Sequence, residues 1–88
     1  MIKYEERAKQ LQNLAEELNA ELISFEYRKQ VFGNMVVKMR KAETVYDFVT
    51  DRGEIYYNNS LVCDASYHQA GKSDTFSRLV EIIKKHVL

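Results

Sequence analysis

The segment Ala70-Gly71-Lys72-Ser73 comes nearer than any other stretch of this chain to a chemical motif. The phosphate-binding loop finishes with glycine, lysine and serine in this order, directly before a helix. Its backbone N–H groups and its lysine hold phosphate oxygens. The full motif requires a further glycine where this chain has Ser66, and it requires a larger α/β domain around it. We therefore expect Gly71 to serve a loop and Ser73 to cap a helix, with no nucleotide hydrolysis and no cofactor.

Cys63, Asp64 and His68 form the next group whose residue types could do chemistry, as a thiol nucleophile beside a carboxylate and an imidazole base. Closeness in sequence does not bring side chains into contact, and a reactive thiol needs neighbours that stabilise the thiolate. Cys63 ends an apolar triplet, 61–63, where a cysteine is commonly a small buried hydrophobe. One cysteine and two histidines also match no zinc spacing. We expect no catalytic residue, no metal site and a protein that is not an enzyme.

Residues 28–41, here called the basic strip, contain five cations and no acidic residue. The cations are Arg28, Lys29, Lys38, Arg40 and Lys41. The whole chain has 13 Lys+Arg and 13 Asp+Glu, so the rest of it is net acidic. A local basic strip on a neutral protein predicts a directed contact. Nucleic-acid binding through residues 28–41 is the alternative to a protein contact, and the neutral total disfavours a large phosphate footprint.

Length and composition predict one ordered domain over residues 1–88. A hydrophobic content of 45% and a charged content of 30% are typical of a globular domain. The chain has no run of about 18 apolar residues, so no membrane contact is expected. The N-terminal segment is charged where a secretory signal is apolar, and a single cysteine forms no internal disulfide. We therefore expect a cytoplasmic protein.

Helical spacing occurs at both ends of the chain. Over residues 3–18, an apolar stripe consists of Tyr4, Ala8, Leu11, Leu14, Ala15 and Leu18. Asn19 is a suitable stop. After an N-cap at Ser73 or Asp74, a second stripe consists of Phe76, Leu79, Val80, Ile83 and Val87. Lys84, Lys85 and His86 follow at its C-terminal end, where the helix dipole favours cations.

Between the helices the apolar period changes to two, which predicts four or five antiparallel strands in a meander. An odd loop such as 32–34 would pair Tyr27 with Met39 and Val31 with Met35. A two-residue turn at 42–43 would pair Met39 with Tyr46 and Val37 with Phe48. A three-residue loop at 51–53, with Gly53 in the left-handed conformation, would set Phe48 against Tyr56. A further turn at 58–60 precedes a possible short fifth strand, 61–63, of undetermined register.

These elements predict an α+β fold with an N-terminal helix, the meander and a C-terminal helix, both helices covering one sheet face. The covered face would hold Phe25, Tyr27, Met35, Val37, Met39, Tyr46, Phe48 and Tyr56. The other face would hold Arg28, Val36, Lys38, Arg40, Val45, Asp47, Val49, Ile55 and Tyr57, with Lys38 opposite Asp47 and Val36 opposite Val49.

This second face mixes apolar and basic residues, and a contiguous exposed apolar area is typical of an interface. We expect Val36, Val49, Ile55 and Tyr57 at the centre of a contact, and Arg28, Lys38 and Arg40 at its rim. The sequence thus predicts a small protein-binding module of the inhibitor or adaptor type that self-associates through this face. Two alternatives stay open: loop 64–72 covers the face, or the residues are ordinary cross-strand pairs.

The order helix, three strands, helix resembles that of the double-stranded-RNA-binding domain. The resemblance is one of element order. Those domains open their last helix with a lysine-rich motif, and this chain has Lys72-Ser73-Asp74-Thr75 there, with an acidic residue inserted. An extra strand is also expected, so the chain is not assigned to that family.

Overall fold

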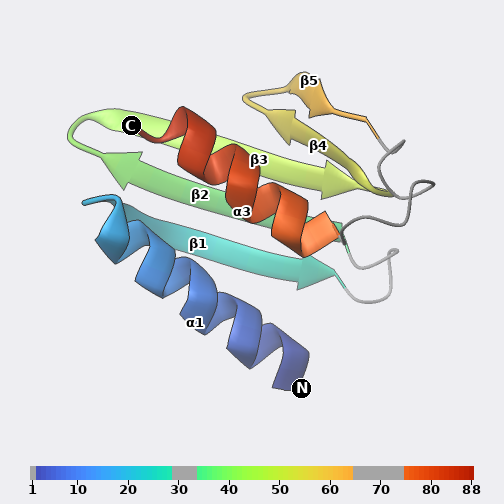
Figure 1. Ribbon diagram of the computed structural model, residues 1–88, viewed down its shortest axis with the longest axis horizontal. Helices are drawn as coiled ribbons and strands as arrows, with labels where there is room; N and C mark the ends of the chain where they lie inside the picture. Colours follow the sequence, from blue (N-terminus) through green and yellow to red (C-terminus); the bar gives the residue numbers. More distant parts are fainter. Residues whose placement is uncertain (1, 29–33, 65–74) are drawn as a thin grey trace.

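The computed structural model describes residues 2–28, 34–64 and 75–88, and it shows a helix, five strands and a second helix (Figure 1). The helices are α1 (Ile2–Glu17) and α3 (Thr75–His86). The strands are β1 (Glu21–Arg28), β2 (Asn34–Lys41), β3 (Thr44–Asp51), β4 (Glu54–Tyr57) and β5 (Ser60–Cys63). They form one antiparallel sheet in the order β1-β2-β3-β4-β5.

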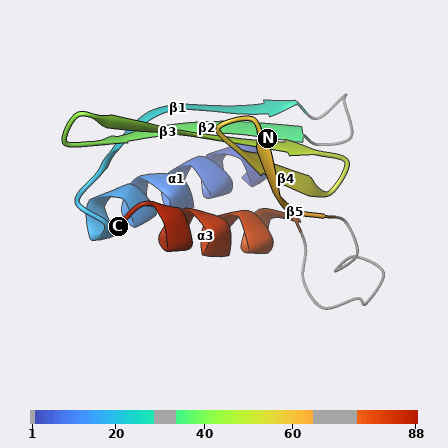
Figure 2. The same ribbon diagram turned by 90° about the horizontal axis from the view of Figure 1, so that it is seen from above.

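Both helices lie on one face of the sheet, side by side (Figure 2). Helix α1 packs on β1 at the edge, and α3 packs on β3 near the middle. The α+β fold expected from the sequence is therefore confirmed, including the placement of both helices on one face. The opposite face, here called the open sheet face, is covered by no described helix.

Helix α1 buries the part of its apolar stripe that faces the sheet, namely Leu11, Leu14 and Ala15. It ends where Asn19 adopts a positive φ of 58°. The Asn19 N–H then donates to the Glu16 carbonyl (3.1 Å) and the Ala20 N–H to the Ala15 carbonyl (2.8 Å). This pair of bonds satisfies carbonyls at the helix end, so the predicted stop at Asn19 is confirmed.

Helix α3 buries the predicted Phe76, Leu79 and Ile83, and it buries Ile82 as well. The predicted Val87 is also buried, directly after the helix ends at His86. A helix over the middle of a sheet has a wide contact face, which explains the additional buried residue. The two N-cap candidates, Ser73 and Asp74, lie outside the described residues.

Arg7 links both helices to the sheet. Its guanidinium carbon lies 5.2 Å from the ring centroid of Tyr27 on β1 and 5.0 Å from that of Phe76 on α3. One of its nitrogens, Nη1, also lies 3.7 Å from Met35 Sδ. A cation between two aromatic faces is attracted by both rings, so Arg7 stabilises the meeting point of α1, β1 and α3.

The pairing of β2 with β3 follows the sequence prediction. Val37 lies opposite Phe48, Met39 opposite Tyr46 and Lys38 opposite Asp47. In the turn at 42–43, Ala42 has a positive φ of 55°. The predicted two-residue turn and both faces of this hairpin are therefore confirmed.

The pairing of β1 with β2 corrects the predicted register while keeping the predicted face. Tyr27 lies opposite Met35, and not Met39, and Phe25 lies opposite Val37. The observed register pairs β1 with β2 along its whole length except at Ile23, where the register shifts, whereas the predicted one would have left residues 21–24 unpaired. The predicted loop, 32–34, and the segment between the two strands, 29–33, both contain an odd number of residues. Phe25 and Tyr27 therefore remain on the helix-covered face. Val31, the other residue of that prediction, lies outside the described residues.

The turn between β3 and β4 corrects the second predicted loop. Asp51 pairs with Glu54, so the turn has two residues, Arg52 and Gly53, with φ values of 53° and 91°. Two positive φ angles are typical of the type I′ turn, which matches the twist of a hairpin. The prediction assigned a positive φ to glycine alone, and so it lengthened the loop by one residue.

A side chain of a neighbouring strand holds this turn. Asn34 Oδ1 accepts a hydrogen bond from the Arg52 N–H (3.0 Å), and Asn34 Nδ2 donates to Asp51 Oδ1 (3.3 Å). Because one residue of register exchanges the two faces of a strand, Ile55 and Tyr57 lie on the helix-covered face and Tyr56 on the open sheet face. Ile55 is fully buried.

The short fifth strand is present. Asn58 and Asn59 form its turn with φ values of 48° and 69°, and Ser60 pairs with Tyr57 as the first residue of β5. A register shift then places Cys63 opposite the buried Ile55, so Cys63 faces the core.

Candidate functional site: the open sheet face

An apolar row crosses the open sheet face from β2 to β5. Cross-strand pairing aligns Val36 with Val49, Val49 with Tyr56 and Tyr56 with Leu61, and these four residues are here called the apolar row. The first three are half-buried, and Leu61 is 51% exposed. Directly opposed residues of an antiparallel pair share a face, so the row is continuous.

Charged residues flank the apolar row on both sides along the strands. On one side lie Lys38 and Asp47, followed by Arg40, which pairs with Glu21 of β1. On the other side, Arg28 pairs with Asn34, and Asp51 pairs with Glu54. The open sheet face therefore has an apolar centre and charged borders of both signs.

In the structure, the described cations of the basic strip do not form one continuous positive surface, because three of them have separate partners. Arg40 Nη2 lies 2.6 Å from Glu21 Oε1, and Arg28 Nη2 lies 3.1 Å from Glu26 Oε1. Lys41 Nζ donates instead to the backbone oxygen of Leu88 (2.8 Å). Lys29 lies outside the described residues. Glu21 is 19 residues from Arg40 in sequence, and Glu26 lies just before the segment 28–41, so the composition of that segment overstated the positive charge of this surface.

Lys38 and Asp47 lie directly opposite each other, yet no ion pair joins them in the described part of the chain. The Asp47 backbone is fixed by Asn58, whose Oδ1 accepts from the Asp47 N–H (3.1 Å) and whose N–H donates to the Asp47 carbonyl (2.8 Å). Asp47 Oδ1 is enclosed and receives no hydrogen bond from any described group. An enclosed carboxylate oxygen without a donor costs free energy, so the negative charge of Asp47 is poorly compensated within the described residues.

Tyr56 carries the polar contact at the centre of the face. Its hydroxyl donates to Glu54 Oε1 (2.8 Å). This hydrogen bond to Glu54 raises the pKa of Tyr56 above 10.0, and desolvation and the charges of Glu54 and Asp51 act in the same direction. Tyr56 thus presents a neutral, oriented ring to the open sheet face.

Five of the seven predicted interface residues lie on the open sheet face: Arg28, Val36, Lys38, Arg40 and Val49. The predicted placement of the other two was wrong, because Ile55 and Tyr57 face the helices. Tyr57 stacks there on Phe48, with ring centroids 5.3 Å apart, and its ring lies tilted against that of His86, with centroids 4.4 Å apart. Tyr56 and Leu61 lie in the apolar row where Ile55 and Tyr57 were expected. The sequence feature that could have revealed this is Arg52-Gly53, which is compatible with a two-residue turn.

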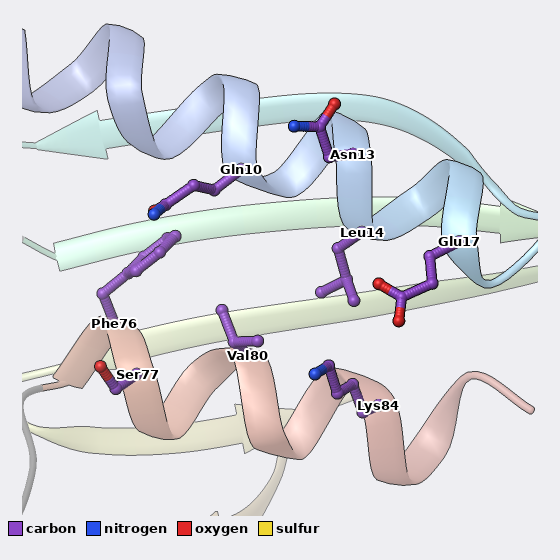
Figure 3. Close-up of a pocket in the computed structure, with 8 residues that line it drawn as sticks. All are labelled: Gln10, Asn13, Leu14, Glu17, Phe76, Ser77, Val80 and Lys84. Carbon is purple, nitrogen blue, oxygen red and sulfur yellow. The ribbon is translucent and has the colours of Figure 1, made fainter.

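A groove of about 410 Å³ runs between α1 and α3 on the other side of the molecule (Figure 3). Its lining is Gln10, Asn13, Leu14 and Glu17 from α1, and Phe76, Ser77, Val80 and Lys84 from α3. Glu17 and Lys84 carry the charges, and both are exposed. The groove therefore lacks a pair of enclosed titratable groups for acid–base chemistry.

Cys63 is buried below the sheet, and its Sγ lies 3.5 Å from the Asp64 carbonyl oxygen. The Arg78 guanidinium bonds to this thiol, which raises the pKa of Arg78. His86 lies on α3 like Arg78, eight residues later and about 12 Å further along the helix axis. Its Nδ1 lies 3.0 Å from the Ile82 carbonyl oxygen. The described residues thus show no cysteine–histidine pair, and His68 lies outside them.

No group of three or more His, Cys, Asp or Glu side chains in the described residues could hold a metal ion. Neither described helix is long and apolar enough to cross a membrane. The loop 70–73, with its partial phosphate-loop sequence, lies outside the described residues.

No protein-family model matches this chain, and no curated protein or solved structure matches it. The open sheet face, with its apolar row uncovered by any described helix, is therefore the feature from which a function can be inferred.

Proposed function

We propose that this protein is a small protein-binding module without catalytic activity, of the inhibitor or adaptor type, that contacts protein through its open sheet face. One observation carries the proposal: both helices cover the opposite face and leave the apolar row uncovered by any described element. Burying such a row against a partner removes apolar surface from water, which supplies affinity. The charged borders orient the partner.

The surroundings of the apolar row also favour binding. Val45, which lies opposite Arg40 on this face, is 49% exposed and adds apolar surface near its border. The row lies on a sheet whose other side is packed against the core, so it is presented on a rigid support and loses little conformational entropy on binding.

Nucleic-acid binding, the alternative given by the basic strip, gains no support from this geometry. Arg28 and Arg40 each lie against a carboxylate of β1, and further acids border the same face. A phosphate backbone would have to compete with these carboxylates for both arginines.

The experiment compares binding by the wild type with binding by Tyr56→Ser/Leu61→Ser. Light scattering reports self-association, and a pull-down from native lysate reports other partners. A matched control, Tyr4→Ser/Leu88→Ser, removes the same residue types from exposed positions elsewhere (42% and 83% exposed). We expect the open-face variant to lose its complexes and the control to keep them. A protein that binds nothing in either assay, or binds equally well after the open-face change, would refute the proposal.

A further inference from the structure

We propose that the open sheet face binds a second copy of this chain, packed face to face about a two-fold axis that runs along the strands between β2 and β3. This inference rests on the proposed function and names its partner. The two copies would form a pair of stacked sheets, about 10 Å apart, with both helical layers on the outside.

The residue pattern on β2 and β3 is self-complementary under this axis. The axis places β2 of one copy over β3 of the other. Residues that pair across the hairpin within one chain then oppose each other across the interface as well. Val36 lies over the partner's Val49, and Lys38 lies over the partner's Asp47. The two-fold axis repeats each contact, so the centre holds two valine pairs and two opposite-charge pairs.

Asp47 supplies the most specific argument for a cation from outside the chain. Its Oδ1 is enclosed and receives no described hydrogen bond, while Lys38 on the same chain is exposed and joins no ion pair in the described ranges. A lysine extending from a sheet about 10 Å away reaches this carboxylate from above. Because Oδ1 itself is enclosed, the partner's Lys38 would compensate the Asp47 charge from the accessible side of this half-buried residue, and the opposite-charge pair would form away from water.

The outer strands fit the same arrangement. Strand β1 of one copy lies over β4 of the other, which brings Arg28 toward the partner's Glu54. Arg40 lies over the partner's Val45, whose side chain is 49% exposed and would be covered by the apolar stem of the arginine.

Two other symmetric arrangements are disfavoured by named residues. A two-fold axis along the apolar row would set Asp47 over the partner's Asp51, which places like charges together. Pairing of two β1 edges would have to accommodate the irregularity between Leu22 and Ser24, and such bulges block edge-to-edge pairing.

The size of the face sets the expected strength. With strands about 4.8 Å apart and residues rising about 3.3 Å, the face measures about 500 Å², so two copies hide about 1,000 Å². That total is near the lower limit for a specific interface. We therefore expect a dimer that dissociates on dilution.

A charge-exchange experiment tests the arrangement by sedimentation velocity. Lys38→Asp gives a chain with two acids at the contact, and Asp47→Lys gives a chain with two lysines. Each variant alone opposes like charges twice, so we expect its dimerisation to weaken at least about 10-fold. A 1:1 mixture restores both opposite-charge pairs, and we expect it to form a heterodimer at the concentrations at which the wild type dimerises. Pairing within one chain cannot produce this recovery.

The control pair carries the same change in net charge on exposed helix positions, Lys85→Asp and Glu16→Lys. If general attraction between acidic and basic proteins were the cause, this pair would show the same gain on mixing, and the inference would be overturned. Circular dichroism checks that each variant is folded, since like charges opposed across β2 and β3 weaken the hairpin.

Zero-length cross-linking of the wild type gives an answer even if a variant fails to fold. Equal amounts of ¹⁴N- and ¹⁵N-labelled protein are mixed and treated with a carbodiimide. A Lys38–Asp47 product that joins the two isotopes supports the arrangement, and a product confined to single chains contradicts it. Wild-type dimers without the mixed product, or a wild-type monomer that still captures another protein through the apolar row, would overturn this inference alone. A protein that binds nothing would overturn the proposed function as well.

Discussion

Phe48 lies opposite Tyr57 across β3 and β4, with their ring centroids 5.3 Å apart, and this pair determines which residues the open sheet face presents. Because Phe48 is fully buried, its cross-strand partner Tyr57 must also face the helices. Tyr56 is then directed to the opposite side. The identity of the candidate interface thus follows from one hairpin register.

Phe48→Ala should lower the free energy of unfolding by about 3–5 kcal/mol, because it leaves a cavity between the sheet and α3. Denaturation by urea, followed by circular dichroism, measures this loss. Ile23→Ala, at a position 45% exposed, is the control and should cost less than about 1 kcal/mol. Equal effects of the two changes would contradict the core described here.

Asn34→Ala should destabilise the fold by about 1–2 kcal/mol, since it removes two hydrogen bonds to the Arg52-Gly53 turn. The same urea experiment measures the loss. Asn13→Ala, an exposed change on α1, should have almost no effect. If Asn34→Ala were equally harmless, Asn34 would not hold the two-residue turn.

Tyr56 should ionise at a higher pH than an ordinary tyrosine, because its hydroxyl donates to Glu54. Ultraviolet absorbance of tyrosinate, compared between the wild type and Tyr56→Phe, isolates this titration. Glu54→Ala should move the pKa of Tyr56 back toward 10.0. Unchanged titration in Glu54→Ala would refute the assigned cause.

The pH dependence of stability follows from the same contact. A raised folded-state pKa means that the folded protein holds this proton more strongly than the unfolded chain does. The contribution is therefore fully present below the unfolded pKa of 10.0 and disappears as the pH rises through the folded value. Tyr56→Phe should remove this component of alkaline destabilisation, which unfolding measured on both sides of that pH would show.

Arg28→Ser/Arg40→Ser should mainly change the salt dependence of association, because rim charges steer approach more than they supply affinity. Sedimentation at several salt concentrations measures it. Tyr56→Ser/Leu61→Ser should instead weaken association at every salt concentration. The reverse ranking, with the arginines dominant and affinity falling steeply with salt, would indicate nucleic-acid binding.

Most of the fold could be predicted from the sequence, because apolar spacing has a different period in helices and strands. The stripes containing Leu11 and Leu79, and the alternation around Val37, gave the helices, the meander and the layer arrangement. An odd number of residues in the loop was enough to place Phe25 and Tyr27 on the correct face, even though the predicted cross-strand partners were wrong.

The errors arose where residues from separate strands determine a turn. Arg52 adopts a positive φ beside Gly53 with the support of Asn34, a contact that no local pattern reveals. Because of that one turn, the predicted interface contained Ile55 and Tyr57, whereas the structure places Tyr56 on the open sheet face. The ion pair of Arg40 with Glu21 likewise depends on the sheet register, and Glu26, the partner of Arg28, lies just outside residues 28–41, so the sequence overstated the basic strip.

The central claim is that the open sheet face joins two copies of this chain, and a dilution series of methyl NMR spectra tests it most directly. On dilution, the methyl signals of Val36, Val45 and Val49, which lie on β2 and β3 beside the proposed axis, should shift together with one dissociation constant. Those of Val80 and Leu14, which line the groove between the helices, should stay fixed. Open-face signals that do not change with concentration, or changes confined to the helix groove, would contradict the claim.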